Sequence, residues 1–196
     1  MAPEPMADIR FEHVSTLYGG KDEQAALALL HAGADAATLR AQAGASVGLN
    51  QLSLHIPSGG LFCVMGLSGS GKSTLVRHIN GLITPSQGRV CVGDTVVNQL
   101  DNAALRHFRQ HRVSMVFQHF GLLPHLTVLQ NVCYGLRVRG TPAAQAHEAA
   151  RHWLAEVDLP QVEARYPDEL SGGMKQRVGL ARALAVDTPV LLMDEA

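Results

Sequence analysis

Residues 61–74 read LFCVMGLSGSGKST, a stretch in which an apolar run leads into a glycine-rich loop. The apolar run, residues 61–66, predicts a strand covered on both faces. The glycines, lysine and serine that follow have the G-x-x-x-x-G-K-[ST] spacing of a phosphate-binding loop, and a helix is expected from about 73 to 82. A strand, a loop of this kind and a helix, in that order, predict a nucleotide-binding core.

The residue types in this loop suit a bound triphosphate. Glycines let several backbone amides converge on phosphate oxygens, and the start of the helix adds its positive dipole end. Lys72 is expected to reach the β- and γ-phosphates, and the Ser73 hydroxyl to bind Mg²⁺. The alternative is a glycine-rich turn with a surface lysine. The residues predicted to bind ATP are Gly66, Ser68, Gly69, Gly71, Lys72, Ser73 and Thr74.

Strands and helices alternate on both sides of this loop, which predicts an α/β layer fold with a mainly parallel sheet. The first part of the chain is expected to form an antiparallel β portion, and the later part is more helical. Expected strands cover 8–18, 46–56, 89–97, 113–118 and 190–193. Expected helices cover two short stretches within 22–44, residues 102–112, and segments that begin at Thr141-Pro142 and after Ser171.

Two acidic residues follow the last apolar run, VLLM at 190–193. Ligands of parallel α/β sheets bind at the carboxyl ends of the strands, so this position favours chemistry on a bound nucleotide. Asp194 is a candidate Mg²⁺ ligand, and Glu195 is a candidate general base that polarises the attacking water. The alternative is a buried strand that simply ends in acids.

Residues 170–177 read LSGGMKQR. Ser171 is expected to cap a helix whose first turn holds Gly172 and Gly173, leaving the amide donors open to an anion. Together with Gln118 in MVFQ, these residues resemble the signature of ATP-binding cassette (ABC) ATPases. The resemblance implies that this helix end meets the γ-phosphate held by the phosphate loop of a second copy, so that two copies form a head-to-tail dimer around two ATP molecules.

The same resemblance implies roles for two further residues. Gln118 would contact Mg²⁺ and the attacking water, and would link the site to a helical subdomain at about 119–170 that contacts a membrane subunit. Tyr18 would stack on adenine. The alternatives are plain side chains at strand ends.

An extra segment at 21–47 makes the chain similar to the ATPase subunits of glycine betaine/proline importers, the quaternary-amine uptake subfamily. The resemblance covers nearly all of 1–196, including GLSGSGKST, FGLLPHLTVLQNV and YPDELSGGMKQRVGLARAL. It implies ATP hydrolysis that powers osmolyte import through membrane permease subunits, a peripheral position on the cytoplasmic face of the plasma membrane, and indirect cooperation with a solute-binding protein.

The sequence stops on the strand pattern PVLLMDEA, so we expect a fragment, incomplete at the C-terminus. The family pattern continues with a Ser-Ala-Leu-Asp loop and a switch histidine, and the subfamily often adds a regulatory tandem domain. The chain as it stands is therefore expected to be inactive.

Composition and spacing argue against other classes. A formal net charge of −1 disfavours nucleic acid as a partner. Three dispersed cysteines give no disulfide framework, and Cys63 and Cys91 are expected in the core. His107 and His111, four residues apart on an expected helix, give too few ligands to hold a metal. His152 lies one position too late after His147 for the H-E-x-x-H pattern of a zinc site. An amino-acid importer subunit remains an alternative, as does a non-transport cassette; a chromosome-type ATPase would need long coiled coils that are missing here.

Overall fold

The computed structural model describes residues 7–194. It divides into two compact units, Met1–Leu105 and Arg106–Ala196, which we describe separately. Helix α4 (Asn102–His111) crosses the boundary between them.

The first unit is built on an antiparallel sheet with strand order β2-β1-β3-β4. Phe11, Val14, Val90 and Val92 are buried in it, and β1 lies at its centre, paired with β2 on one side and β3 on the other. This is the expected antiparallel portion. Its elements are β1 (Ile9–Gly19), α1 (Glu23–His31), α2 (Ala36–Ala43), β2 (Ala45–Ile56), α3 (Lys72–Ile79), β3 (Gln87–Val92), β4 (Thr95–Val96) and the 3-10 turn η1 (Val97–Gln99).

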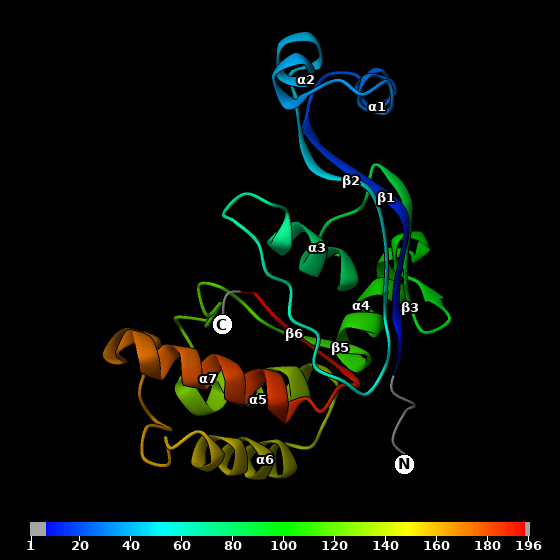
Figure 1. The fold of residues 1–196 in the computed structure, drawn as a ribbon. Helices are drawn as coiled ribbons and strands as arrows, with labels where there is room; N and C mark the ends of the chain where they lie inside the picture. Colours follow the sequence, from blue (N-terminus) through cyan, green and yellow to red (C-terminus); the bar gives the residue numbers. More distant parts are fainter. Residues whose placement is uncertain (1–6, 195–196) are drawn as a thin grey trace. The chain divides into compact units, whose positions relative to one another are not determined.

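Helices α1 and α2 lie together beyond one end of the β1–β2 ribbon (Figure 1). Asp22 and Asp35 cap them, each accepting a hydrogen bond from a backbone amide three residues further on. The two helices bury Ala26, Leu30 and Leu39 in a small core of their own.

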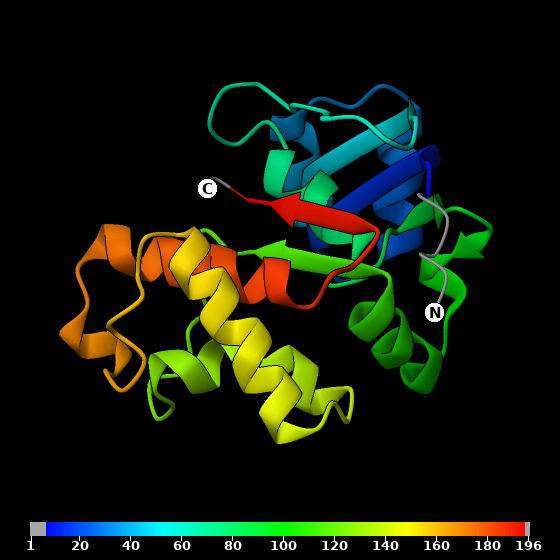
Figure 2. The same ribbon diagram turned by 90° about the horizontal axis from the view of Figure 1, so that it is seen from below.

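The second unit contains a parallel strand pair, β5 (Val113–Val116) and β6 (Val190–Met193), which lie side by side in Figure 2. Helices α5 (Val128–Val138), α6 (Ala143–Glu156) and α7 (Gly172–Ala185) pack against one another, and α7 also contacts β5. A second 3-10 turn, η2 (Pro167–Glu169), precedes α7. The core between the helices includes Val128, Val132, Ala146, Ala150, Leu154, Val178 and Ala181.

Two expectations are wrong. The run 61–66 is not a strand, and its side chains are largely exposed, with Leu61 at 92% and Met65 at 90%. A strand covered on both faces needs hydrogen-bonded neighbours, and none pairs with this run among residues 7–194. Cys63 is exposed for the same reason, whereas Cys91 is buried as expected.

The other errors are small. The helix after Thr141-Pro142 begins at Ala143, with Pro142 in the cap position and no side-chain cap, so Thr141 lies one residue too early. The expected strand 89–97 is a hairpin, because Gly93 and Asp94 turn the chain between β3 and β4. Within 119–170 the chain forms helices α5 and α6.

Candidate nucleotide-binding site

The predicted phosphate loop runs directly into α3. Gly71 caps the helix with φ +90°, a conformation that glycine adopts without strain. The Lys72 ammonium folds back and donates hydrogen bonds to the carbonyl oxygens of Gly66 and Leu67, both at 2.8 Å. Lys72 therefore lies over the loop that it is predicted to serve, where a phosphate could replace these carbonyls as its acceptor.

Two glycines allow the loop to approach strand β2. A Cβ atom on Gly71 would lie 2.5 Å from the carbonyl oxygen of Gly48, and a Cβ on Gly48 would lie 2.6 Å from the Tyr18 ring. A side chain at Gly71 would therefore push the loop away from β2, and one at Gly48 would displace the Tyr18 ring. Sequence reasoning missed Gly48, although a glycine inside a strand pattern signals close approach of another backbone.

Tyr18 lies beside the first turn of α3. Its hydroxyl is 3.0 Å from the hydroxyl of Thr74, and its side chain is 41% exposed. The structure thus brings together two residues that were predicted separately, one for the base and one for the phosphates. An exposed ring at this point can stack on an adenine whose phosphates occupy the loop.

A buried histidine holds the other end of α3. His78 is 1% exposed; its Nδ1 donates to the carbonyl oxygen of Ile83 at 2.8 Å, and its Nε2 lies 2.7 Å from the hydroxyl of Thr16 on β1. Because a carbonyl oxygen can only accept, Nδ1 of neutral His78 carries the proton, and Nε2 accepts a hydrogen bond from the Thr16 hydroxyl. Burial lowers the pKa of His78 below its ordinary value. The helix that carries Lys72, Ser73 and Thr74 is thereby fixed to the sheet.

In the second unit, predicted site residues follow the carboxyl ends of the two parallel strands. Gln118 lies two residues beyond β5, and Asp194 follows β6 directly. The Asp194 amide donates to the carbonyl oxygen of Val116 at 3.0 Å, which continues the strand pairing, and the Asp194 side chain is buried. Glu195 lies outside the described residues.

Ser171 caps α7, as predicted. Its hydroxyl accepts a hydrogen bond from the Met174 amide at 3.3 Å. Gly172 and Gly173 form the start of the helix, and a Cβ added at either would meet no atom within 4 Å. The helix N-terminus is therefore open enough to receive an anion.

The available ligands suit magnesium rather than a softer metal. Ser73, Gln118 and Asp194 offer hydroxyl, amide and carboxylate oxygens, and Mg²⁺ usually combines one or two such groups with substrate phosphates and water. Within residues 7–194 no three His, Cys, Asp or Glu side chains cluster closely enough to hold a metal by themselves.

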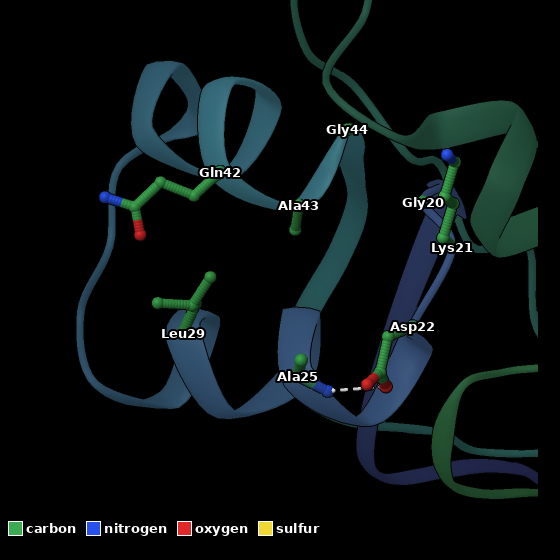
Figure 3. Close-up of a pocket in the computed structure, with 8 residues that line it drawn as sticks. All are labelled: Gly20, Lys21, Asp22, Ala25, Leu29, Gln42, Ala43 and Gly44. Carbon is green, nitrogen blue, oxygen red and sulfur yellow. Dashed lines mark hydrogen bonds between the residues drawn. The ribbon is translucent and has the colours of Figure 1, made fainter.

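A separate hollow lies in the α1–α2 region (Figure 3). It has a volume of about 540 Å³, and Asp22 at its edge accepts the capping hydrogen bond from Ala25. None of the predicted site residues lines it. The lining residues are Gly20, Lys21, Asp22, Ala25, Leu29, Gln42, Ala43 and Gly44.

A protein-family model described as ABC transporter matches residues 49–196. The chain is 45% identical over 177 residues to the glycine betaine/proline betaine transport system ATP-binding protein ProV of Salmonella typhimurium, a match that covers 90% of this chain and 44% of ProV. It is 44% identical over 188 residues to the glycine betaine transport ATP-binding protein OpuAA of Bacillus subtilis, covering 96% of this chain and 45% of OpuAA.

It is also 50% identical over 150 residues to the methionine import ATP-binding protein MetN of Rhodopseudomonas palustris, covering 76% of this chain and 40% of MetN. The chain thus spans less than half the length of these curated relatives.

Solved structures agree with the expected fold class. The dimeric, post-hydrolysis structure of the ATP-binding cassette MJ0796, described as bound to ADP and Pi, is similar with a TM-score of 0.79 and 30% identity, over 95% of this chain and 73% of the other. The α/β fold with a phosphate-loop core is thereby confirmed. No helix within residues 7–194 is both long and apolar enough to span a bilayer. The chain belongs to the ABC transporter family.

Proposed function

We propose that this chain is the ATP-binding and ATP-hydrolysing part of an importer, and that it powers the uptake of a small osmolyte such as glycine betaine, proline betaine or choline. The observation that carries the proposal is the phosphate loop beside Tyr18, with Lys72 folded over its carbonyls and the start of α3 beneath it. The names of ProV and OpuAA support the solute class.

Each residue of the proposed site has a role that follows from its chemistry. Lys72 neutralises charge on the β- and γ-phosphates, while Ser73, Gln118 and Asp194 hold Mg²⁺, which stabilises the same charge. Glu195 accepts a proton from the attacking water, and Gln118 orients that water. Tyr18 stacks on the adenine. The remaining loop contacts come from Gly66, Ser68, Gly69, Gly71 and Thr74.

The second copy is proposed to close each site. Ser171, Gly172 and Gly173 of one copy would face the γ-phosphate held by the loop of the other, with the helix dipole of α7 directed at it. The related cassette structures are described as dimeric, which supports this arrangement. Closure that depends on the bound nucleotide can then do work on attached membrane subunits.

We further propose the domain organisation and location expected from sequence. Residues 1–196 form an ABC ATPase domain, residues 21–47 form an inserted helical hairpin, and about 119–170 form the helical subdomain that contacts a permease. The protein would be peripheral on the cytoplasmic face of the plasma membrane, and would serve a solute-binding protein indirectly.

The test uses the complete protein with its permease in membrane vesicles. Glu195→Gln should retain ATP, stop hydrolysis and stop uptake of radiolabelled glycine betaine, because the water loses its base while the phosphate contacts remain. Glu148→Gln, an exposed carboxylate on α6, is the matched control and should behave like the unmodified protein. ATPase activity close to normal in Glu195→Gln would contradict the assigned base.

Uptake measurements in the same vesicles distinguish between the two candidate solutes. Methionine import is the second candidate, because the match to MetN reaches 50% identity, although over fewer residues than the match to ProV. ATP-dependent uptake of glycine betaine without uptake of methionine would support the proposal. The reverse result would replace the solute while leaving the ATPase assignment in place.

A further inference from the structure

The turn that carries Gln118 rests on helix α7, the helix that begins at the signature serine. Arg182 on α7 donates hydrogen bonds to the carbonyl oxygens of Gly121 at 2.6 Å and Phe120 at 2.8 Å. Both acceptors lie in the segment between β5 and α5, more than 60 residues earlier in the chain, as the residue numbers show. One guanidinium group therefore binds two successive carbonyls of this turn.

The turn has a conformation that needs such support. Phe120 has φ +60° and Gly121 has φ +56°, and the left-handed region is strained for a phenylalanine. Inside the turn, the Phe120 amide donates to the carbonyl oxygen of Phe117 at 2.9 Å, and the Gly121 amide donates to that of His119 at 2.6 Å. Gln118 lies between these donors and acceptors, so its backbone position is fixed by the turn.

The surface of α7 fits the turn closely. A Cβ atom at Gly179, one helical turn before Arg182, would lie 3.6 Å from the carbonyl oxygen of Phe120. A Cβ at Gly121 would lie 3.5 Å from the Arg182 guanidinium. The absence of a side chain at Gly179 lets the turn pack against α7, and Arg182 then binds the carbonyls of the turn.

We infer that Arg182 is a positioning residue that couples the signature helix to Gln118, so that a movement of α7 at Ser171 is passed to the side chain proposed to orient the attacking water. The inference rests on the proposed function of Gln118. Arg182 acts through the backbone of the turn, at the carbonyls of Phe120 and Gly121. A lysine cannot replace it, because an ammonium group lacks the planar fork that binds two carbonyls at once.

The test is a double-mutant cycle on the complete transporter, measured by ATPase kinetics. Arg182→Lys should lower kcat about tenfold and leave KM for ATP within about twofold, since a misplaced catalytic contact mainly slows chemistry. In a Gln118→Ala background the same change should alter kcat by less than about twofold, because the residue through which Arg182 acts is gone. Hydrogen exchange of the 117–121 amides should speed up in Arg182→Lys.

Arg177→Lys is the matched control. Arg177 is on the same helix and also donates to backbone carbonyls, those of Val157 and Asp158, away from the turn. Its kcat should stay within about twofold of the unmodified transporter. Circular dichroism and size-exclusion elution of each purified variant report whether it is folded. If Arg182→Lys does not fold, Gly179→Leu, which presses against Phe120 from the same helix, replaces it with the same expected readouts.

Three results would overturn the inference: an unchanged kcat in Arg182→Lys, an equal loss in the presence and absence of Gln118, or a loss of the same size in Arg177→Lys. Failure of the proposed function gives a different result, since the unmodified transporter would then hydrolyse no ATP and the cycle would have no starting rate.

Discussion

At the scale of single residues, the phosphate loop depends on side chains at the far end of α3, the helix that follows the loop. His78 joins α3 to β1 through Thr16 and to the following turn through Ile83, and its side chain is buried. A protonated His78 would have to place a charge in this apolar setting. The burial of a neutral imidazole on α3, the helix that follows the phosphate loop, therefore links stability to pH.

We expect His78 to make the chain less stable as the pH is lowered. Its pKa is lowered in the folded state, so between that lowered value and about 6.5 the unfolded chain binds a proton that the folded chain does not. The free energy of unfolding then decreases as pH falls, and His78 contributes at most about 1.4 kcal/mol per pH unit to this decrease. Above about pH 7 the contribution of His78 no longer changes with pH. Urea unfolding between pH 5 and 8 measures the slope.

His78→Gln should flatten this slope, because glutamine can make similar hydrogen bonds and does not titrate. His31→Gln, an exposed histidine at the end of α1, is the control and should leave the slope unchanged. An identical pH dependence in His78→Gln and the unmodified chain would contradict the expected role of burial.

Residue patterns along the chain predicted the cap at Ser171, because its partner, the Met174 amide, lies only three residues away. They did not predict Gly48, His78 or Arg182. These three act on partners far away in sequence: Gly48 accommodates Tyr18, His78 binds Thr16, and Arg182 binds the turn at Phe120. A single sequence carries no signal for such pairs beyond a glycine inside a strand pattern.

At the scale of elements, the α1–α2 hairpin is joined to the sheet at a point that suits a tight turn. Gly19 pairs with Ala45 across the β1–β2 ribbon, so Gly20 and Gly44 are the next residues on each strand. Both have positive φ, +85° and +64°, as do the two central residues of a type I′ hairpin turn. Everything between them can be regarded as an insertion into this turn.

We therefore expect deletion of residues 21–43, which joins Gly20 to Gly44, to leave the ribbon intact. ATP affinity, measured by titration with a fluorescent ATP analogue, should stay within about threefold, about 0.7 kcal/mol. Stability should fall, because Leu17 and Val47 lose the helices that pack against them. Lys72→Ala serves as the control that loses binding. A folded deletion variant that no longer binds the analogue would show that the hairpin belongs to the nucleotide site.

The expected elements were found where short-range signals were strong, such as the capping serine at the start of α7. The run 61–66 was the main error among them. Its apolar residues indicated a buried strand, but a strand also requires partners, and composition does not say which segments will supply them. Exposure of Leu61 and Met65 shows that apolar sequence alone does not create a strand.

At the scale of the whole molecule, the account requires that each ATP is shared by two copies. The phosphate loop and Tyr18 belong to the first unit, while Gln118, Ser171 and Asp194 belong to the second. A shared site means that one copy supplies the loop and the other supplies the signature serine. Two inactive variants, one altered in the phosphate loop and the other at the signature serine, should then regain ATP hydrolysis when they form mixed dimers.

The most direct measurement is ATP hydrolysis by a mixture of two inactive variants of the complete protein. Lys72→Ala removes the loop contact to phosphate. Ser171→Asp keeps a helix cap but places a negative charge where the γ-phosphate should lie. In a mixed dimer, the loop of the Ser171→Asp copy meets the intact serine of the Lys72→Ala copy, and one complete site forms. Each variant alone should be inactive, and the mixture should recover hydrolysis at a clear fraction of the unmodified rate. A mixture as inactive as its components, from copies that do form dimers, would contradict a site shared between two copies.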